Sequence, residues 1–399
     1  MPRRLYVVAG KVTDSVTYGF LPAADRLGLD VTVLTDRPDE HERTHPGREV
    51  VGCDVTDFRE IINTVRSPDA IFSNSDHLQA PTALAADYFG LPGKDWRAAT
   101  RTKNKALMRR HLAEEIYSAE LGADRTGEHQ APYPLVLKPR EGVASEDVVL
   151  VRSAGELAAR AAEIGGRRPG RSGRPGRTGL PGGRRPLIVE EYLPGRLHTL
   201  ETLGDGRTLH VLGSFRTTIS PPPYFVEERL EWAPPPAESG QIRAHLHDLG
   251  VGFGACHTEF VVHEGRARLI EVNYRIIGDH CDFLLADLLR FPVFEEVLKV
   301  HLGAPPREPP PPPGAAGHAI VDYVLATRSG TLTAAPATGD YDAGDVRITY
   351  RSVRQSGAAI ALSNTNRDYL GTIQAIGPEP AAVESAIARF RADHTWDIT

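Results

Sequence analysis

Short apolar runs alternate with helical segments at the start of the chain. The run at residues 4–9 (RLYVVA) ends in Gly10, and DVTVLTD, EVVGCD and DAIFSNSD follow as three further strand-like runs. Segments with helical periodicity, such as FREIINTVR, separate them. This order predicts a parallel α/β domain over residues 1–100. The Gly10 turn lacks the GxGxxG spacing, so a dinucleotide site is not supported.

Polar residues stand where these predicted strands end. Asp36, Asp54 and the cluster Ser73-Asn74-Ser75-Asp76 fall at the carboxyl edge, where open α/β sheets bind their ligands. Asp, Ser and Asn are also common helix caps, and capping is the simpler explanation of the same residues.

The stretch Ala255 to His280 predicts a β-hairpin that turns at Gly265. In its second strand Glu271, Asn273 and Arg275 occupy every other position, so their side chains share one face. Glu259 on the first strand could lie opposite. Carboxylate and amide oxygens suit Mg²⁺, and a metal-bound polyphosphate would satisfy all four groups. The alternative is a hairpin whose charges face water.

Two lysines upstream offer the complementary chemistry. Lys105 falls in the first turns of a predicted helix from Thr102, and Lys138 ends a strand that opens into the loop REGVAS. An ammonium group and loop N–H groups placed together can hold phosphate oxygens. Either lysine alone could be a solvated surface charge. Phosphate-binding cations and a separate Mg²⁺ face are, however, the two halves that a nucleoside triphosphate needs.

The strand LIVEEYLPG could form the wall of a base-binding pocket. Its edge from Glu190 to Leu193 can present backbone groups to a flat base, with Val189 and Tyr192 as apolar neighbours. The next segment predicts a hairpin that turns at residues 204–206.

Two segments have compositions that cannot bury a core. Residues 165–186 are rich in Gly, Pro and Arg, which predicts a disordered insertion. Its arginines could attract anions, but no aromatic residues are interleaved, and a flexible loop is favoured. The segment EPPPPPGAAG predicts a linker over residues 304–316. Beyond it, short strands and a final helix predict a small α+β module over 317–399.

Composition narrows the class of protein. The chain has 399 residues, a net charge of -6, and 41% hydrophobic and 25% charged residues, which is ordinary for a soluble multidomain protein. The net charge gives no support to nucleic-acid binding. No apolar run approaches the ~20 residues of a membrane span. The three scattered cysteines and the lack of a signal peptide predict a cytoplasmic protein.

Taken in order, Lys105, LVLKPREGVAS, VEEYLPG, HTEFVV and LIEVNYRIIGD resemble the motifs of the ATP-grasp superfamily. The nearest likeness is to its carboxylate–amine ligases, with L-amino acid ligases, biotin carboxylase and glycinamide ribonucleotide synthetase as relatives. The resemblance implies a three-part α/β and α+β architecture. Residues 1–100 would be the pre-ATP-grasp domain, 101–303 the ATP-grasp domain with a lid at about 125–195, and 317–399 the small closing module.

The resemblance also implies roles for individual residues. Lys105 and Lys138 would hold the ATP phosphates, Glu259, Glu271 and Asn273 would bind Mg²⁺ (Mn²⁺ as the alternative), and Arg275 would steady the carboxylate and its acyl phosphate. The loop residues Glu141, Gly142 and Ser145 would cover the phosphates, and the adenosine would contact Glu190, Glu191, Leu193 and His198. Many relatives have a ribose-binding Glu where this chain has Leu197, and His198 or Glu201 could replace it.

The resemblance therefore predicts an ATP-dependent ligase (EC 6.3 type) that forms an amide from a carboxylate and an amine through an acyl phosphate. Amino acids and precursors of peptides or siderophores are the expected substrates, and a homodimer is the assembly common among relatives. Two alternatives remain: an ATP-grasp carboxylase or purine-pathway ligase, and a non-catalytic nucleotide-binding protein. The bicarbonate-handling residues of biotin carboxylase have no match here. Residues flanking the catalytic strands could line the substrate pocket: Arg216, His257, Asp279 and His280.

Overall fold

A computed structural model describes residues 2–112, 115–122, 131–166, 185–310 and 317–399. The chain forms two compact units, each assembled from three separate stretches. The first unit comprises residues 1–103, 198–215 and 232–317, and the second comprises 104–197, 216–231 and 318–399. The sequence predicts consecutive segments instead. Most of the predicted insertion (167–184), part of the linker (311–316) and part of the lid (123–130) lie outside the described residues.

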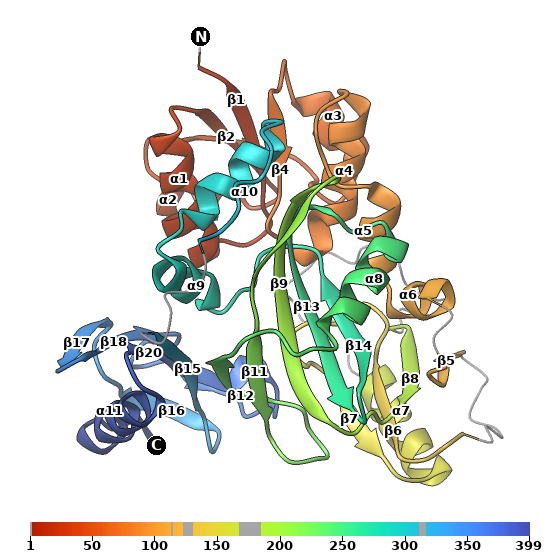
Figure 1. The fold of residues 1–399 in the computed structure, drawn as a ribbon, viewed down its shortest axis with the longest axis vertical. Helices are drawn as coiled ribbons and strands as arrows, with labels where there is room; N and C mark the ends of the chain where they lie inside the picture. The colour runs from red at the N-terminus through yellow and green to blue at the C-terminus, as the bar shows by residue number, and fades with distance from the viewer. Residues whose placement is uncertain (1, 113–114, 123–130, 167–184, 311–316) are drawn as a thin grey trace. The chain divides into compact units, whose positions relative to one another are not determined.

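The first unit begins with the predicted parallel sheet, in the strand order β3-β2-β1-β4 (Figure 1). Alternate residues of β1 pack on opposite faces, as the strand period requires. Tyr6 and Val8 join a core with Ile61 and Ala85 from the helices α3 and α4. The strands are β1 (Arg4–Val8), β2 (Asp30–Thr35), β3 (Glu49–Gly52) and β4 (Ala70–Phe72), with α2 (Pro38–Thr44), α3 (Phe58–Thr64), a 3₁₀ turn (Asp76–Leu78) and α4 (Gln79–Tyr88) between or after them.

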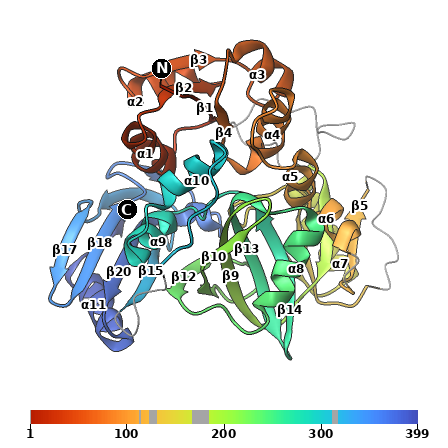
Figure 2. The ribbon, with the colours of Figure 1, turned by 45° about the horizontal axis from the view of Figure 1, so that its top comes forward.

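Other helices pack on the sheet through aromatic rings. Phe20, at the end of a π-helical turn (Ser15–Phe20) before α1 (Leu21–Arg26), lies 4.5 Å from the ring of Phe72 and 5.0 Å from that of Phe294. Phe294 belongs to α10 (Val293–His301), which follows α9 (Cys281–Leu289) after the predicted break at Pro292. Figure 2 shows α10 beside α1.

The first unit also contains an antiparallel group of strands ordered β14-β13-β9, with β10 paired to β9. The predicted hairpin is confirmed: β13 (Phe253–His263) and β14 (Arg266–Asn273) join at Gly265, whose φ of 72° suits glycine. The second predicted hairpin is also present, as β9 (Arg196–Asp205) and β10 (Leu209–Gly213). The helices of this part are α5 (Trp96–Lys103) and α8 (Ser239–Leu249).

The second unit begins with an antiparallel sheet in the order β5-β8-β6-β7. Its apolar face packs against Leu157 and Ile164 of α7. The helix predicted from Thr102 instead begins at Lys105, because α5 ends at Lys103. The elements are α6 (Lys105–Leu112), β5 (Ser118–Leu121), β6 (Leu135–Pro139), β7 (Val149–Val151), α7 (Ala154–Gly166) and β8 (Leu187–Glu191).

The remainder of the second unit contains the segment predicted as a C-terminal α+β module (317–399), together with residues 216–231, and its sheet runs β12-β15-β20-β18-β17. The helix α11 (Pro380–Asp393) packs on it, with Phe390 near the rings of Tyr350 and Trp396. The predicted strand AIALSN shortens to two residues. The strands are β11 (Phe215–Ile219), β12 (Glu227–Trp232), β15 (His318–Leu325), β16 (Gly330–Ala334), β17 (Gly339–Ala343), β18 (Val346–Ser352), β19 (Ala359–Ile360), β20 (Tyr369–Gly377) and β21 (Asp397–Ile398).

Within the described ranges, no helix has the length and apolar character needed to cross a bilayer.

Candidate functional site

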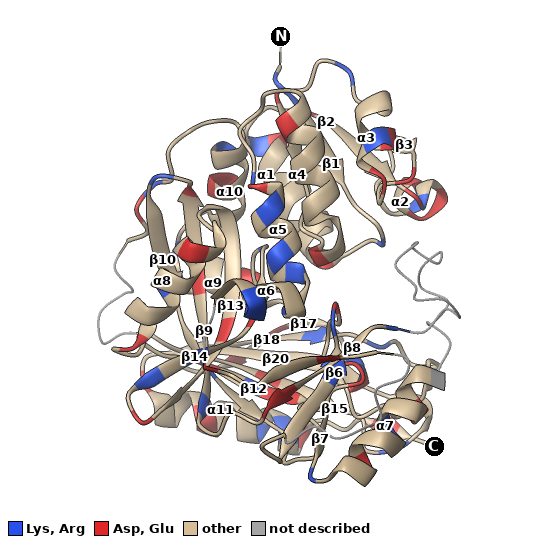
Figure 3. Ribbon diagram, turned by 90° about the vertical axis from the view of Figure 1, so that its right-hand side faces the viewer, with Lys and Arg blue, Asp and Glu red and all other residues tan. Residues whose placement is uncertain are grey.

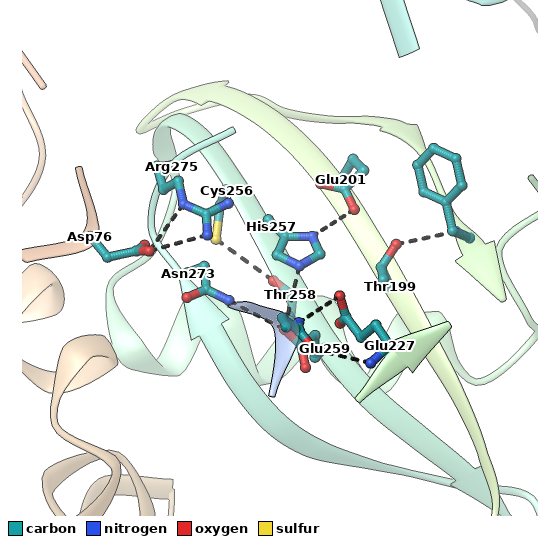
Figure 4. A network of polar contacts seen from close by, with 12 residues as sticks. Asp76, Thr199, Glu201, Glu227, Cys256, His257, Thr258, Glu259, Asn273 and Arg275 are labelled. Carbon is teal, nitrogen blue, oxygen red and sulfur yellow. Dashed lines mark hydrogen bonds and ion pairs between the residues drawn. The ribbon is translucent and has the colours of Figure 1, made fainter. Parts of the chain in front are cut away.

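The two candidate metal-binding carboxylates lie directly opposite each other in the first unit. Glu259 of β13 pairs with Glu271 of β14. Two residues before Glu259, His257 pairs with Asn273. The Asn273 Nδ2 atom lies 3.4 Å from Glu259 Oε1. Figure 4 shows Glu259, His257 and Asn273 gathered on one face of these strands. The shared face predicted from the alternation is therefore present for Glu271 and Asn273, whereas Arg275 lies beyond the strand, because β14 ends at Asn273.

These oxygens fit a divalent cation. Like charges directly opposite each other in an antiparallel pair are destabilising unless something offsets them. Two carboxylates and an amide oxygen are hard ligands of the kind that Mg²⁺ and Mn²⁺ take. Among the described residues no group of three His, Cys, Asp or Glu side chains is arranged to hold a metal ion. A cation at Glu259 and Glu271 would take its further ligands from other oxygens, such as the amide of Asn273.

His257 lies between two carboxylates. Its Nδ1 is 2.8 Å from Glu201 Oε1 on β9, and its Nε2 is 3.5 Å from Glu259 Oε1. Burial alone would lower the pKa of His257, but the charges of Glu201 and Glu259 outweigh it and raise the pKa to about 10. His257 is therefore a cation at neutral pH. Its positive charge offsets part of the negative charge of Glu201 and of Glu259, a candidate metal ligand.

Arg275 is held in one orientation by Asp76. Its Nε and Nη2 atoms both lie 3.1 Å from Asp76 Oδ2, and its Nη1 donates to the carbonyl of Ile276 at 2.8 Å. Burial opposes the charge of Arg275, but Asp76 raises the pKa of the guanidinium above its ordinary value. Of the five N–H groups of the guanidinium, three are used in these contacts. The other two can bind an anion.

The segment after Arg275 is folded back on it. The charge of Asp279 contributes to the raised pKa of Arg275, so this carboxylate lies within its electrostatic range. His280 Nε2 contacts Asp14 Oδ2 at 2.6 Å. Asp279 and His280 both have left-handed φ angles, of 52° and 67°, which are costly for residues other than glycine. The structure thus places Asp279 near Arg275 and His280 against Asp14.

A second polar cluster lies in the second unit, around Glu190 of β8. Lys138 Nζ is 2.6 Å from Glu190 Oε2, and Arg109 Nε of α6 is 2.9 Å from Glu190 Oε1. All three side chains are buried. Burial alone would raise the pKa of Glu190, but the charges of Lys138 and Arg109 lower it to about 2. Burial lowers the pKa of Lys138, with Arg109 and Lys105 acting in the same direction.

Lys105 joins this cluster to the glycine loop. It is the first residue of α6, is buried, and its Nζ lies 3.5 Å from the carbonyl of Gly142. Glu141 accepts from Arg140 at 3.0 Å, while Ala144 and Ser145 have φ angles of 56° and 54°. Figure 3 shows the basic residues of α6 as blue segments. Lys138 and Arg109 at Glu190, with Lys105 at the glycine loop, are cations of the kind that bind polyphosphate.

The remaining predicted residues are placed as follows. Glu190 is hydrogen-bonded in the sheet between β5 and β6, and Leu193 is buried just beyond the end of β8, after the half-buried Glu191. His198 lies on β9 in the first unit, where its ring stacks on Phe260. Arg216 lies in the second unit, with Nη2 2.5 Å from Glu231. Contacts of these residues with adenosine or substrate stay predictions.

Four residues of these clusters receive no metal, phosphate or substrate role from the sequence: Asp76, Lys94, Arg109 and Glu201. Asp76 stands at the end of a predicted strand, where ligands bind, and Glu201 is offered only as a replacement ribose contact. Lys94 is buried and donates to Gln79 Oε1 and to the carbonyl of Tyr274, which precedes Arg275. Burial lowers the pKa of Lys94 to about 7. Nothing in the sequence near Lys94 or Arg109 marks either residue.

Sequence similarity to a known protein extends over the whole chain. No protein-family model matches it. The uncharacterized protein y4rH of Sinorhizobium fredii is 26% identical over 427 aligned residues, which cover 100% of this chain and 84% of the relative. Carnosine synthase 1 of Gallus gallus is 29% identical over 269 residues, which cover 61% of this chain and 28% of the relative. This chain therefore matches under a third of that protein.

A solved structure of an L-amino acid ligase from Bacillus licheniformis superposes with a TM-score of 0.76 at 19% identity, covering 100% of this chain and 99% of that one. Phosphoribosylglycinamide synthetase from Anaerococcus prevotii gives a TM-score of 0.68 at 12% identity, with both chains covered in full. These likenesses establish the fold and confirm the architecture expected from the motif order.

Proposed function

From the ATP-grasp fold of this chain, we propose that it is an ATP-dependent carboxylate–amine ligase. The observation that carries the proposal is the face of the first unit on which Glu259 opposes Glu271, with Asn273 beside them and Arg275 two residues further on. A metal-binding pair next to a fixed guanidinium suits the transfer of a phosphoryl group to a carboxylate. The cations around Glu190 suit the phosphates of the nucleotide.

In the proposed reaction a carboxylate oxygen of the substrate attacks the γ-phosphorus of ATP, and ADP leaves. Arg275 binds the carboxylate through its two remaining N–H groups and stays in place because Asp76 holds the other side of the guanidinium. Lys105 and Lys138 neutralise phosphate oxygens. Mg²⁺ bound by Glu259, Glu271 and Asn273 would offset the charge of the phosphates.

The second half of the proposed reaction forms the amide. The amine attacks the acyl carbon, its lone pair forms the C–N bond, and inorganic phosphate leaves with the electrons of the broken C–O bond. The amine nitrogen loses a proton in this step. The residues of the site contribute mainly by positioning reactants and by charge neutralisation.

A screen of carboxylate and amine pairs, with ADP release and product mass as readouts, tests the proposal. The panel should hold amino acids, β-alanine with histidine (carnosine is their amide, and a relative is named carnosine synthase), and bicarbonate. An amide product supports the ligase. Bicarbonate-dependent turnover would indicate a carboxylase, and MgATP binding without turnover would indicate a non-catalytic protein.

Matched variants of the hairpin test the metal assignment. Glu271→Ala should abolish turnover and weaken MgATP binding, whereas Glu264→Gln, at the exposed turn of the same hairpin, should change neither. Unchanged MgATP affinity in Glu271→Ala would refute the assignment.

A further inference from the structure

Three carboxylate oxygens in the described part of the chain are buried without any hydrogen-bond partner: Asp76 Oδ1, Glu201 Oε2 and Asp282 Oδ2. Buried polar atoms in folded proteins are nearly always paired, so each calls for an explanation. Asp76 already binds Arg275 through its other oxygen, and Asp282 lies at the start of α9. Glu201 lies on β9, the strand next to the hairpin that carries Glu259, Glu271 and Asn273.

The surroundings of Glu201 define what could pair with it. Only 1% of Glu201 is exposed, and its Oε1 is occupied by His257 Nδ1. His257 in turn contacts Glu259, the proposed metal ligand. The charge of Glu201 also contributes to the raised pKa of Arg275, so the two groups lie within electrostatic range. Figure 4 shows the ring of His257 beside Glu201, with Arg275 near Asp76 in the same view.

An ionised carboxylate oxygen accepts hydrogen bonds and cannot donate them. Among the reactants of the proposed ligation, the phosphates and the substrate carboxylate carry negative charge. The amino group is the positively charged donor. A charge-assisted hydrogen bond from an ammonium would satisfy Oε2 and recover the cost of burying it.

We propose that Glu201 Oε2 binds a substrate ammonium group. His257 is a positioning residue, because its Nδ1–H holds Oε1 and leaves Oε2 as the oxygen without a partner among the described residues. This inference rests on the proposed function. The ammonium belongs either to the attacking amine or to an amino acid whose carboxylate Arg275 holds, and the two sources make different kinetic predictions.

A binding experiment tests the proposal without requiring turnover. Thermal shifts are recorded with MgADP and the twenty standard amino acids plus β-alanine, each beside its des-amino carboxylate. Stabilisation by an amino compound, absent with its des-amino partner and lost in Glu201→Gln, supports the proposal. Equal shifts in wild type and variant, or no shift with any amino compound, overturn it.

If the screen finds a ligation, kinetics identify the source of the ammonium. Glu201→Gln should raise one KM about 10- to 100-fold, that of the amine or that of the acyl donor, because a hydrogen bond to a charged group is lost. Glu201→Asp keeps the carboxylate, so its KM should lie between those of the wild type and Glu201→Gln. Glu296→Gln removes a buried carboxylate elsewhere in the same unit and is the control. If Glu201→Gln keeps the KM values and the turnover of the wild type, the ammonium-binding role of Glu201 is refuted and the proposed ligase is not. If the wild type is inactive with every pair, the proposed ligase is refuted.

MgATP affinity separates ammonium binding from a metal-binding role. Glu201→Gln should keep the Kd of MgATP within about twofold, because Glu201 is not assigned to the metal. A joint loss of MgATP and amino-compound binding would instead make Glu201 a metal ligand and overturn the proposal.

Discussion

Replacing Glu190 by Gln removes the carboxylate that Arg109 and Lys138 share. Glu190 bonds Arg109 and Lys138 while only 3% of it is exposed. The substitution keeps the size of the side chain and one acceptor oxygen, so the change is mainly one of charge. It leaves two buried cations without their anion, the situation in which a broken buried ion pair costs most.

The magnitude follows from the pKa of Glu190. The difference between its ordinary value of 4.5 and about 2 in the folded chain corresponds to about 3 kcal/mol of stability at neutral pH. Because the folded pKa is lowered, this stability is present above pH ~4.5 and is lost as pH falls through ~2. Burial lowers the pKa of Lys138, so keeping this lysine charged costs free energy in the folded chain. About 3 kcal/mol is therefore an upper value for the net stabilisation.

Urea unfolding of wild type and Glu190→Gln at pH 7 and pH 3 measures this effect. We expect the variant to be less stable by about 3 kcal/mol at pH 7, and the difference to shrink by about 2 kcal/mol at pH 3. Glu120→Gln is the control: it lies on the neighbouring strand β5 and forms exposed ion pairs, for which we expect under about 1 kcal/mol. An equal loss for Glu190→Gln at both pH values would refute the reasoning.

Three further outcomes are expected. Arg275→Lys keeps the charge but loses the two-atom contact with Asp76, so ligation should fall roughly 100-fold while calorimetry shows nearly unchanged MgATP affinity; an equal loss of both would contradict this. Burial raises the pKa of Asp282 to about 6. The folded protein therefore loses stability as pH rises from 3.8 through 6, because a buried carboxyl group must then carry its charge. Asp282→Asn should accordingly raise the Tm at pH 8 and not at pH 4. Arg367 contacts Glu146 beside the glycine loop, so Arg367→Ala should weaken ATP about two- to fivefold, whereas the exposed Arg389→Ala should not.

The predictions that the structure confirms depend on contacts close in sequence. A tight turn fixes the register of β13 and β14 near Gly265, and alternation places Glu271 and Asn273 on one face. Glu259 lies opposite Glu271 only because a bulge between Glu259 and Phe260 shifts the register, and neither the turn nor the alternation predicts that shift. The break at Pro292 and the turn at Gly265 likewise follow from local backbone chemistry. Local rules do not, however, divide the chain into units, because each unit is assembled from three distant stretches.

The contacts that the sequence could not predict join residues far apart in the chain. Arg275 and Asp76 are separated by 199 positions, and Glu201 and His257 by 56. Alternation on each strand limits which face a side chain takes, but it cannot say which strand lies next to it or in what register. Glu201 is an example. The sequence predicts that it lies on a strand, but its contact with His257 follows only from the strand order β14-β13-β9.

The pair of Lys138 and Glu190 shows what this changes for function. The resemblance to ATP-grasp enzymes implies that Lys138 holds phosphate and Glu190 meets adenine, as separate contacts. In the sheet Lys138 is opposite Ile188 and Glu190 is opposite Val136, so the two are diagonal neighbours on one face, within reach of each other. If Lys138 binds phosphate as proposed, Glu190 still neutralises part of its charge. Arg109 compensates, since it shares the same carboxylate, and phosphate affinity should depend on Arg109 although it has no motif of its own.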